Sequence, residues 1–272
     1  MSAAVARERV SAHIERIAVP SPTLPPATTT NAWVLGQGDV MVVDPGCPWP
    51  EGQAALWAAL DGRRVRSVLL THHHPDHVGG LDALLEQTGA AAYAHPLTAA
   101  ALGRDDLRPV VEGDVLHVDG VEWQALHTPG HAVGHLCLWS AAASAVVAGD
   151  MVAGEGTIIL APPDADLAAF MAGLARLAAL EPTWALPAHG PALRPGGDVF
   201  RMNLAHRAAR TEALAAALAP HPQAPSALVA QVYGPLPPAV VPLAEVQLHA
   251  HLRFLVDAGA ALEGPQGWAR AR

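Results

Sequence analysis

The chain contains no lysine, and its 16 basic residues, all arginine, stand against 25 acidic residues. The formal net charge of −9 argues against a protein built mainly to neutralise a nucleic-acid backbone. Cysteine is also scarce, since Cys47 and Cys137 are the two present. Two thiols are too few for a disulfide framework, so we expect a reducing, cytoplasmic location, with Cys47 as a small buried thiol rather than a ligand.

Long uninterrupted apolar runs are absent as well, so we expect no membrane-spanning helix. The N-terminal segment carries Arg7, Glu8, Arg9 and Glu15 without an apolar core, and we therefore expect no secretory signal. Aromatic residues make up only 4% of the chain, but 51% of it is hydrophobic, so alanine, valine and leucine can build a core. A length of 272 residues suits one large domain, or a domain with a smaller second one.

What the chain does have is a dense cluster of metal-ligand residues, where His72, His74, Asp76 and His77 follow the spacing H-x-H-x-D-H. Neutral imidazole nitrogens and carboxylate oxygens are ligands that suit divalent zinc. The apolar run at 67–70 predicts a buried strand before the motif. Because residues two apart in an extended stretch point to the same side, His72 and His74 can converge on one ion.

The second half of the motif predicts the start of a helix. Pro75 fixes the turn, and Asp76 and His77 then begin a helix that can face a second ion beside the first. The apolar residues of that helix recur at helical spacing: Val78, Leu81, Leu84 and Leu85. A position between a strand and a helix argues against an exposed, tag-like histidine cluster. His73 lies between two candidate ligands and should point away from them.

Three further candidate ligands each end a strand-like segment beside glycine or proline: His131, Asp150 and His189. A carboxylate at Asp150 could bridge two cations. Seven candidate ligands are too many for one tetrahedral ion that must keep a position open for water, whereas two ions can share them. We therefore expect two zinc ions per chain, with manganese or iron as alternatives.

In these motifs the chain resembles the metallo-β-lactamase-fold metallohydrolases. The resemblance implies three sets of ligands: His72, His74 and His131 for the first metal, Asp76, His77 and His189 for the second, and Asp150 as the bridge. It also implies a structural role near the site for Asp44, which ends the apolar run at 40–43. Every ligand position of the family is present, so the resemblance implies an active centre.

Residues 1–196 alternate strand-like runs, helix-like runs and turn signals. Strands in two pairs are predicted at 31–35, 40–43, 135–139 and 145–148. Helices are predicted at 51–60 and 164–180. Strand pairs with flanking helices in both halves favour an α/β fold with two sheets face to face and helices outside. This agrees with the four-layer αββα metallo-β-lactamase sandwich that the resemblance implies for the catalytic domain.

The composition changes after His189. Residues 194–197 predict a linker, and helices separated by prolines follow at 199–218, 226–233 and 243–257, the second of them with Ser226 as its N-cap. The segment 260–268 predicts a small hairpin. Three helices and a hairpin indicate a small winged-helix domain at 197–272, with a helical cap over the active site as the alternative.

The tail narrows the resemblance to the β-lactamase-like protein 2 branch of the superfamily, and more distantly to glyoxalase II. The segments that carry it are Thr30 to Trp33, Gly149 to Met151, Gly154 to Thr157, His206 with Arg207 and Arg210, Leu228 to Tyr233, and His251 with Leu252. Members of the branch include a single-strand-specific endoribonuclease, and many bacterial relatives are named hydroxyacylglutathione hydrolases. We expect the loop at 154–157 to line the pocket, and His206 and His251 to serve packing or domain docking.

The ligand set predicts a hydrolase in which a metal-bridging hydroxide attacks a carbonyl carbon or a phosphorus. Asp76 is the candidate catalytic residue, which orients the nucleophile and shuttles its proton while remaining a ligand. The acidic N-terminal part favours a small-molecule substrate, namely a thioester, ester or lactone. A single-strand endoribonuclease and a non-enzymatic metal or nucleic-acid binding module are the alternatives, so RNA and a second copy of the chain stay open as partners. In the tail, Arg201, Arg207 and Arg210 could steer an anionic substrate.

Overall fold

Two β-sheets form the centre of the structure, a computed structural model that describes residues 5–271. The first sheet follows the chain order: β1 (Ala6–Ser11), β2 (Ile14–Pro20), β3 (Thr29–Leu35), β4 (Asp39–Val43), β5 (Arg64–Leu69), β6 (Ala91–Ala94) and β7 (Arg108–Pro109). Its first four strands pair antiparallel, and β5, β6 and β7 join in parallel.

The second sheet has the order β12 (Trp184–Pro187), β11 (Ala145–Gly149), β10 (Leu136–Ser140), β9 (Val121–His127) and β8 (Val115–Val118). Its β12 is parallel to β11, and the other pairs are antiparallel. The predicted strand pairs β3–β4 and β10–β11 are therefore confirmed.

Helices cover the outer faces of both sheets. On the first sheet lie α1 (Pro50–Leu60), α3 (Leu81–Thr88) and α4 (Pro96–Leu102), and on the second lie α5 (Leu167–Ala179) and α6 (Gly196–Ala217). The strand β4 shows how the sequence produces these layers. Val40 and Val42 pack under α1, while Met41 and Val43 pack between the sheets, because alternate side chains of a strand point to opposite faces. A strand buried on both sides therefore reads as an unbroken apolar run.

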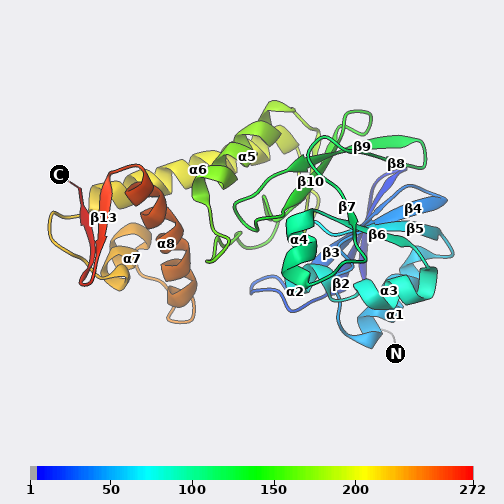
Figure 1. Ribbon diagram of the computed structural model, residues 1–272, viewed down its shortest axis with the longest axis horizontal. Coiled ribbons are helices and arrows are strands. Elements are labelled where there is room, and N and C mark those ends of the chain that lie inside the picture. Colours follow the sequence, from blue (N-terminus) through cyan, green and yellow to red (C-terminus); the bar gives the residue numbers. More distant parts are fainter. Residues whose placement is uncertain (1–4, 272) are drawn as a thin grey trace.

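The C-terminal residues form three helices and a hairpin in the predicted order. After α6 come α7 (Pro225–Tyr233), α8 (Val241–Asp257) and the antiparallel pair β13 (Ala261–Gly264) and β14 (Gly267–Arg270). Figure 1 shows α7, α8 and β13 gathered at the end of α6 that lies away from the two sheets. Leu228, Leu248 and Trp268 lie in a separate apolar core of this region. The winged-helix assignment and the division at residue 196 stay predictions.

Two of the four residues interpreted as a linker at 194–197 belong to a helix instead. Gly196 and Gly197 form the first turn of α6, which runs unbroken to Ala217. A Cβ on Gly196 would lie 2.8 Å from the backbone nitrogen of Ala185, so glycine is needed there for close packing on β12 rather than for flexibility. The two-sheet sandwich and the C-terminal helices thus share one continuous helix.

The helix predicted from Asp76 to Leu85 is two helices. The short α2 (Pro75–Val78) ends at Gly79, and α3 starts at Leu81. The backbone N–H of Gly80 donates to the carbonyl of Pro45 at 2.6 Å, and a Cβ on Gly80 would lie 2.4 Å from that oxygen. This contact ends the first helix, and it brings the 45–48 segment against the metal-ligand motif.

Two predicted helix starts also differ from the structure. The helix predicted from residue 164 begins at Leu167, because Asp166 is its N-cap and its carboxylate accepts from the backbone N–H of Ala169 at 2.9 Å. Ser226 was the predicted N-cap of α7, but Pro225 already occupies the first turn of that helix. Among residues 5–271, no helix is long and apolar enough to cross a membrane.

Candidate metal centre

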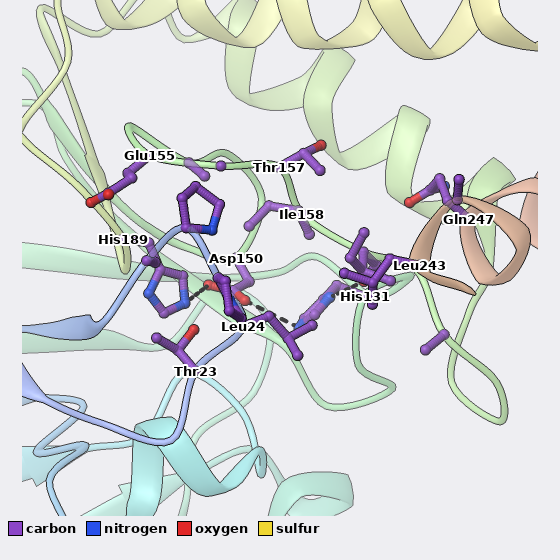
Figure 2. A pocket seen from close by; sticks show the side chains of 18 of the residues that line it. Thr23, Leu24, His131, Asp150, Glu155, Thr157, Ile158, His189, Leu243 and Gln247 are labelled. Carbon is purple, nitrogen blue, oxygen red and sulfur yellow. Dashed lines mark hydrogen bonds and ion pairs between the residues drawn. The ribbon is translucent and has the colours of Figure 1, made fainter. Parts of the chain in front are cut away.

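The seven predicted ligands meet at one edge of the sandwich, where strands of both sheets end. His72 and His74 follow β5, Asp150 follows β11 and His189 follows β12. The other three come from α2 and from the loop between β9 and β10: Asp76, His77 and His131. Figure 2 shows Asp150 between His189 on one side and His131 on the other. The fold thus brings together every residue that the sequence predicted for the metal site.

Three imidazole nitrogens form a first cluster. Nε2 of His72 lies 2.9 Å from Nδ1 of His74, and Nε2 of His131 lies 3.2 Å from the former and 3.0 Å from the latter. Nitrogens around a tetrahedral zinc ion are roughly 3.3 Å apart at ordinary bond lengths. The spacing of these three atoms is therefore suited to one shared ion.

A second cluster lies beside the first. Oδ2 of Asp76 is 3.5 Å from Nε2 of His189 and 3.9 Å from Nε2 of His77. Nε2 of His77 is buried and has no hydrogen-bond partner. Because buried polar atoms are normally paired, this nitrogen is of the kind that a cation would satisfy.

The Asp150 carboxylate faces both clusters. Its Oδ2 lies 3.3 Å from Nε2 of His131, and its Oδ1 lies 3.6 Å from Nε2 of His77 and 3.5 Å from Nε2 of His189. Oδ1 is buried without a hydrogen-bond partner. This is the geometry that a bridging carboxylate requires.

Hydrogen bonds at Nδ1 turn the Nε2 atoms of several of these histidines toward the site. Nδ1 of His131 is 2.9 Å from the carbonyl oxygen of Ile159, and Nδ1 of His189 is 3.0 Å from that of Thr29. A carbonyl can only accept, so each Nδ1 carries the proton and each Nε2 has a free lone pair. The backbone thereby selects the tautomer that can bind a metal.

Asp44 and Thr71 orient the rings of His72 and His77 in the same way, through contacts at Nδ1. The Asp44 carboxylate accepts from the backbone N–H of Thr71 at 2.8 Å and from its hydroxyl at 2.7 Å. The other neighbour of this carboxylate is Nδ1 of His77, at 2.8 Å. Oγ1 of Thr71 then accepts from Nδ1 of His72 at 3.0 Å, since its own proton goes to Asp44. The predicted structural role of Asp44 is therefore visible in its contacts, whereas Thr71 was not singled out from the sequence.

His135 contacts the backbone of Asp150, in the role of a hydrogen-bonding core histidine that the sequence predicted. Its Nε2 accepts from the backbone N–H of Asp150 at 3.0 Å, and its Nδ1 lies 2.9 Å from the hydroxyl of Thr128. Gly149, at φ +49°, allows this approach, because a Cβ there would lie 2.5 Å from Nε2 of His135.

His73 lies outside both clusters. Its Nε2 is 3.5 Å from the Asp164 carboxylate, and it forms a separate group with His74 and Asp164 that could also hold an ion. Cys47 is buried, with its thiol 3.5 Å from the carbonyl oxygen of Trp49, and burial raises the pKa of that thiol. Its surroundings are those of an inert thiol.

The protonation of the site follows from burial and charge. Burial, and next the neighbouring imidazoles, lowers the pKa of His72 and of His131 well below the usual histidine value and that of His74 to about 4. These three rings are neutral at pH 7, with lone pairs available. Burial also acts to lower the pKa of His77, but Asp44, Asp150 and Asp76 together raise it to about 10. The second cluster therefore holds an excess of carboxylate charge that a divalent cation would balance.

A cavity of about 580 Å³ opens over these residues. One wall is the loop at 22–27, and the opposite wall is the loop at 153–161 that follows Asp150, so the prediction that residues just past this acid line the pocket is confirmed for Glu155, Gly156 and Thr157. The far end is formed by side chains of α6, α7 and α8. The sequence had assigned His206 and His251 to packing or docking, but both also line this cavity.

The sequence pattern of the metallo-β-lactamase superfamily matches residues 25–189, which include all seven candidate ligands. The chain belongs to the metallo-β-lactamase superfamily. It is a hydrolase of this superfamily with a candidate His/Asp metal site, and the fold and family predicted from the motifs are confirmed.

Curated relatives include one that carries the name of the predicted branch. Lactamase-like protein vrtG of Penicillium aethiopicum is 29% identical over 86% of this chain and 77% of that protein. The beta-lactamase-like protein 2 homolog of Caenorhabditis elegans is 29% identical over 86% of this chain and 80% of that protein.

Two further relatives have names that state a reaction. The atrochrysone carboxyl ACP thioesterase of Aspergillus fumigatus is 29% identical over 67% of this chain and 42% of that protein. The hydroxyacylglutathione hydrolase of Idiomarina loihiensis is 33% identical over 40% of this chain and 42% of that protein. The chain thus spans less than half the length of both.

Solved structures extend the likeness to the whole chain. A beta-lactamase domain protein from Burkholderia ambifaria superimposes with a TM-score of 0.85 at 25% identity, over 100% of this chain and 95% of that one. A metallo-beta-lactamase family protein from Thermus thermophilus gives 0.80 at 25% identity, over 96% and 100%. The protein TTHA1623, solved in a di-iron-bound form, gives 0.51 at 32% identity, over 66% and 96%.

Proposed function

We propose that the chain is a dinuclear zinc hydrolase of small acyl compounds, with thioesters, esters and lactones as its substrate class. The observation that carries the proposal is the Asp150 carboxylate, which faces two separate clusters of buried ligand atoms at the base of a single cavity. The names of the acyl-carrier-protein thioesterase and of the hydroxyacylglutathione hydrolase support thioester chemistry.

The first ion would be held by His72, His74 and His131, and the second by Asp76, His77 and His189, with Asp150 shared. Two such ions, when bound, polarise a carbonyl oxygen and ionise a water molecule near neutral pH. Iron or manganese would use the same donors, and the di-iron form of a relative supports iron as the main alternative.

Groups of the chain itself hold the donor atoms in place and handle the proton of the nucleophile. Buried imidazoles and backbone carbonyls keep the donor atoms aimed at the site without rearrangement. Asp76 lines the cavity, and its Oδ2 is close enough to both His77 and His189 to orient a nucleophile there and to accept its proton. Neither cysteine is placed to act as a nucleophile, since Cys47 and Cys137 are both buried.

Single-stranded RNA is the competing substrate. The cavity is lined along most of its length by apolar side chains, among them Leu24, Ile158, Leu236 and Leu243, and such a surface favours an apolar acyl compound over a polynucleotide.

Two measurements test the proposal. Elemental analysis after mild dialysis should find about two zinc-class ions per chain, and a value that stays at one under zinc-replete conditions contradicts a dinuclear centre. A parallel assay of the metal-loaded protein on acyl thioesters, lactones and single-stranded RNA should find turnover of the acyl compounds. Turnover of RNA alone would replace the acyl hydrolase with the endoribonuclease.

A further inference from the structure

The end of the cavity away from the metal residues is lined by polar side chains of the C-terminal helices. Arg207 and Arg210 come from α6, Tyr233 ends α7, and Gln247 and His251 lie one turn apart on α8. Figure 2 shows α8 with Gln247 on the His131 side of the site, away from His189. None of these residues belongs to the seven candidate ligands.

Two of these residues carry positive charges that the protein does not balance. Arg207 is only 4% exposed, its Nη2 donates to the carbonyl of Ile158 at 2.6 Å, and its guanidinium lies 5.2 Å from the ring centre of Phe170. Arg210 lies 4.3 Å from the ring centre of Tyr233 and donates to a backbone carbonyl. Within residues 5–271, the ion pairs of arginine involve neither of them. A buried charge is costly without a counter-charge, so an anion here would be stabilising.

Gln247 adds a neutral donor whose orientation is set by the backbone. It is 6% exposed, and its Oε1 accepts from the backbone N–H of Leu160 at 3.1 Å. The amide group is therefore placed with Nε2 free, and that atom is buried without a partner. The hydroxyl of Tyr233 is likewise buried and unpartnered.

His251 adds an acceptor. It is fully buried, and its Nδ1 lies 2.8 Å from Oγ1 of Thr211, which donates its own proton to the carbonyl of Arg207 at 3.0 Å. Nδ1 must then carry the ring proton, so Nε2 has a free lone pair, and that atom also has no partner. Tyr233, Gln247 and His251 all line one cavity, and each has a buried polar atom without a partner, which is unusual for a site that binds nothing.

We propose that this end of the cavity binds an anionic oxygen group, a carboxylate or a phosphate, which the substrate carries far from its scissile acyl bond. Arg207 and Arg210 supply the counter-charge, and Gln247 and Tyr233 donate neutral hydrogen bonds. The acceptor on His251 suits a protonated oxygen, such as the P–OH of a singly charged phosphate or a neighbouring hydroxyl. We call these five residues the distal anion site.

The substrate class follows from the two ends of the cavity and from the apolar wall between them. The acyl carbon lies at the metal residues, the apolar side chains of Ile158, Leu243 and Ala244 contact the body of the substrate, and the distal anion site holds its charged end. This assignment of the substrate rests on the proposed function for its metal end. The distal anion site also replaces the expectation that Arg201, Arg207 and Arg210 together steer an anionic substrate. Arg201 is exposed, pairs with Glu181 and Asp198, and does not line the cavity.

Two matched variants on α6 and one variant on α8 test the site. Arg210→Gln removes a cation of the distal anion site, and Arg201→Gln removes an exposed cation on the same helix. Gln247→Glu keeps an acceptor for the N–H of Leu160 but replaces the free donor with a negative charge. Each is assayed on the mono-4-nitrophenyl ester of adipic acid, on its neutral methyl ester analogue, and on the 4-nitrophenyl ester of 6-phosphooxyhexanoic acid.

The natural sequence and Arg201→Gln should both prefer a charged ester over the methyl ester by about tenfold or more in kcat/KM, an effect expected mainly in KM. Arg210→Gln and Gln247→Glu should reduce that ratio toward one. The charged ester with the higher kcat/KM shows whether the distal anion site prefers a carboxylate or a phosphate. Equal kcat/KM for charged and neutral esters in the natural sequence, or equal loss of preference in Arg201→Gln and Arg210→Gln, overturns the distal anion site.

A binding measurement separates this inference from the proposed function. Calorimetric titration of the metal-loaded protein with hexyl phosphate should give affinity that drops at least fivefold in Arg210→Gln and Gln247→Glu but not in Arg201→Gln. That pattern without any ester hydrolysis would refute the acyl hydrolase and support the distal site. Unchanged affinity in all three variants would place hexyl phosphate elsewhere and refute the distal site.

Discussion

Oδ2 of Asp44 lies 2.8 Å from Nδ1 of His77, and this contact turns the other ring nitrogen of His77 toward Asp150. Both residues are almost completely buried, and the backbone at Asp44 has a φ of +55°, which few residues other than glycine adopt. Aspartate is among the few residues that tolerate this conformation, and its carboxylate is the group that contacts His77. Asp44 is therefore a positioning residue for the second ligand cluster.

Asp44→Asn should weaken binding of the second metal ion by roughly 10–100-fold, because an amide cannot accept from both Thr71 and His77 as a carboxylate does. Chelator competition that resolves the two binding events would measure the change. Asp39→Asn is the matched control, since that exposed carboxylate contacts Arg66 and lies far from the site. Equal affinities in Asp44→Asn and the natural sequence would show that Asp44 does not position His77.

Asp150→Asn should lower the content of both metal ions and reduce acyl hydrolysis by roughly 100-fold or more, because a neutral amide replaces a carboxylate that faces both clusters. His73→Ala should leave the content of the two proposed ions unchanged, since His73 belongs to neither of their ligand clusters and its side chain lies near Asp164. Both variants can be compared by elemental analysis after the same dialysis. If they lost metal equally, the ligand assignment would be wrong.

Gly149→Ala should destabilise the fold by about 2–4 kcal/mol and also lower metal content, because its Cβ would meet Nε2 of His135 in a backbone conformation unfavourable for alanine. Gly62→Ala separates the contact with His135 from the unfavourable backbone conformation. Gly62 also has a positive φ, of +75°, but an added Cβ meets nothing within 4 Å. This control should therefore cost only about 1 kcal/mol and keep its metal. Urea unfolding and metal analysis of the pair would show whether the His135 contact matters.

His251 predicts a pH dependence of stability. Burial, and then the nearby Arg207 and Arg210, lowers the pKa of His251 to about 3, from the ordinary value of 6.5. The neutral ring is favoured in the folded state, so its contribution is complete above about pH 6.5 and falls as the pH drops toward 3, where the unfolded chain takes up the proton first.

The loss attributable to this group should be about 2 kcal/mol at most between pH 7 and pH 5. Urea unfolding of His251→Gln should show a correspondingly flatter decline over this range. His221→Gln, at an exposed position, should follow the natural sequence. Parallel declines in all three proteins would mean that acid instability arises elsewhere, for example from release of metal ions.

The candidate ligands are visible in the sequence because their signal is local. His72 and His74 are two residues apart after an apolar strand, so they point to the same side, and Asp150 and His189 each follow the end of a strand. A local pattern misleads where a contact from elsewhere in the chain overrides it. Gly80 ends the predicted helix because Pro45 packs on it, and Gly196 begins a helix because the backbone of β12 lies against it.

The sequence by itself predicted which residues could bind metal and that two ions could share them, and its unbroken apolar runs predicted strands buried on both faces. These properties depend on neighbours along the chain. Only the tertiary structure decided which nitrogen of His77, His189 and His131 faces the site, through acceptors at Asp44, Thr29 and Ile159 respectively. It also decided that Arg207 and Gln247 share a cavity with the metal residues. Both outcomes depend on contacts between residues distant in the chain, where packing and hydrogen-bond geometry, rather than local propensity, select the arrangement.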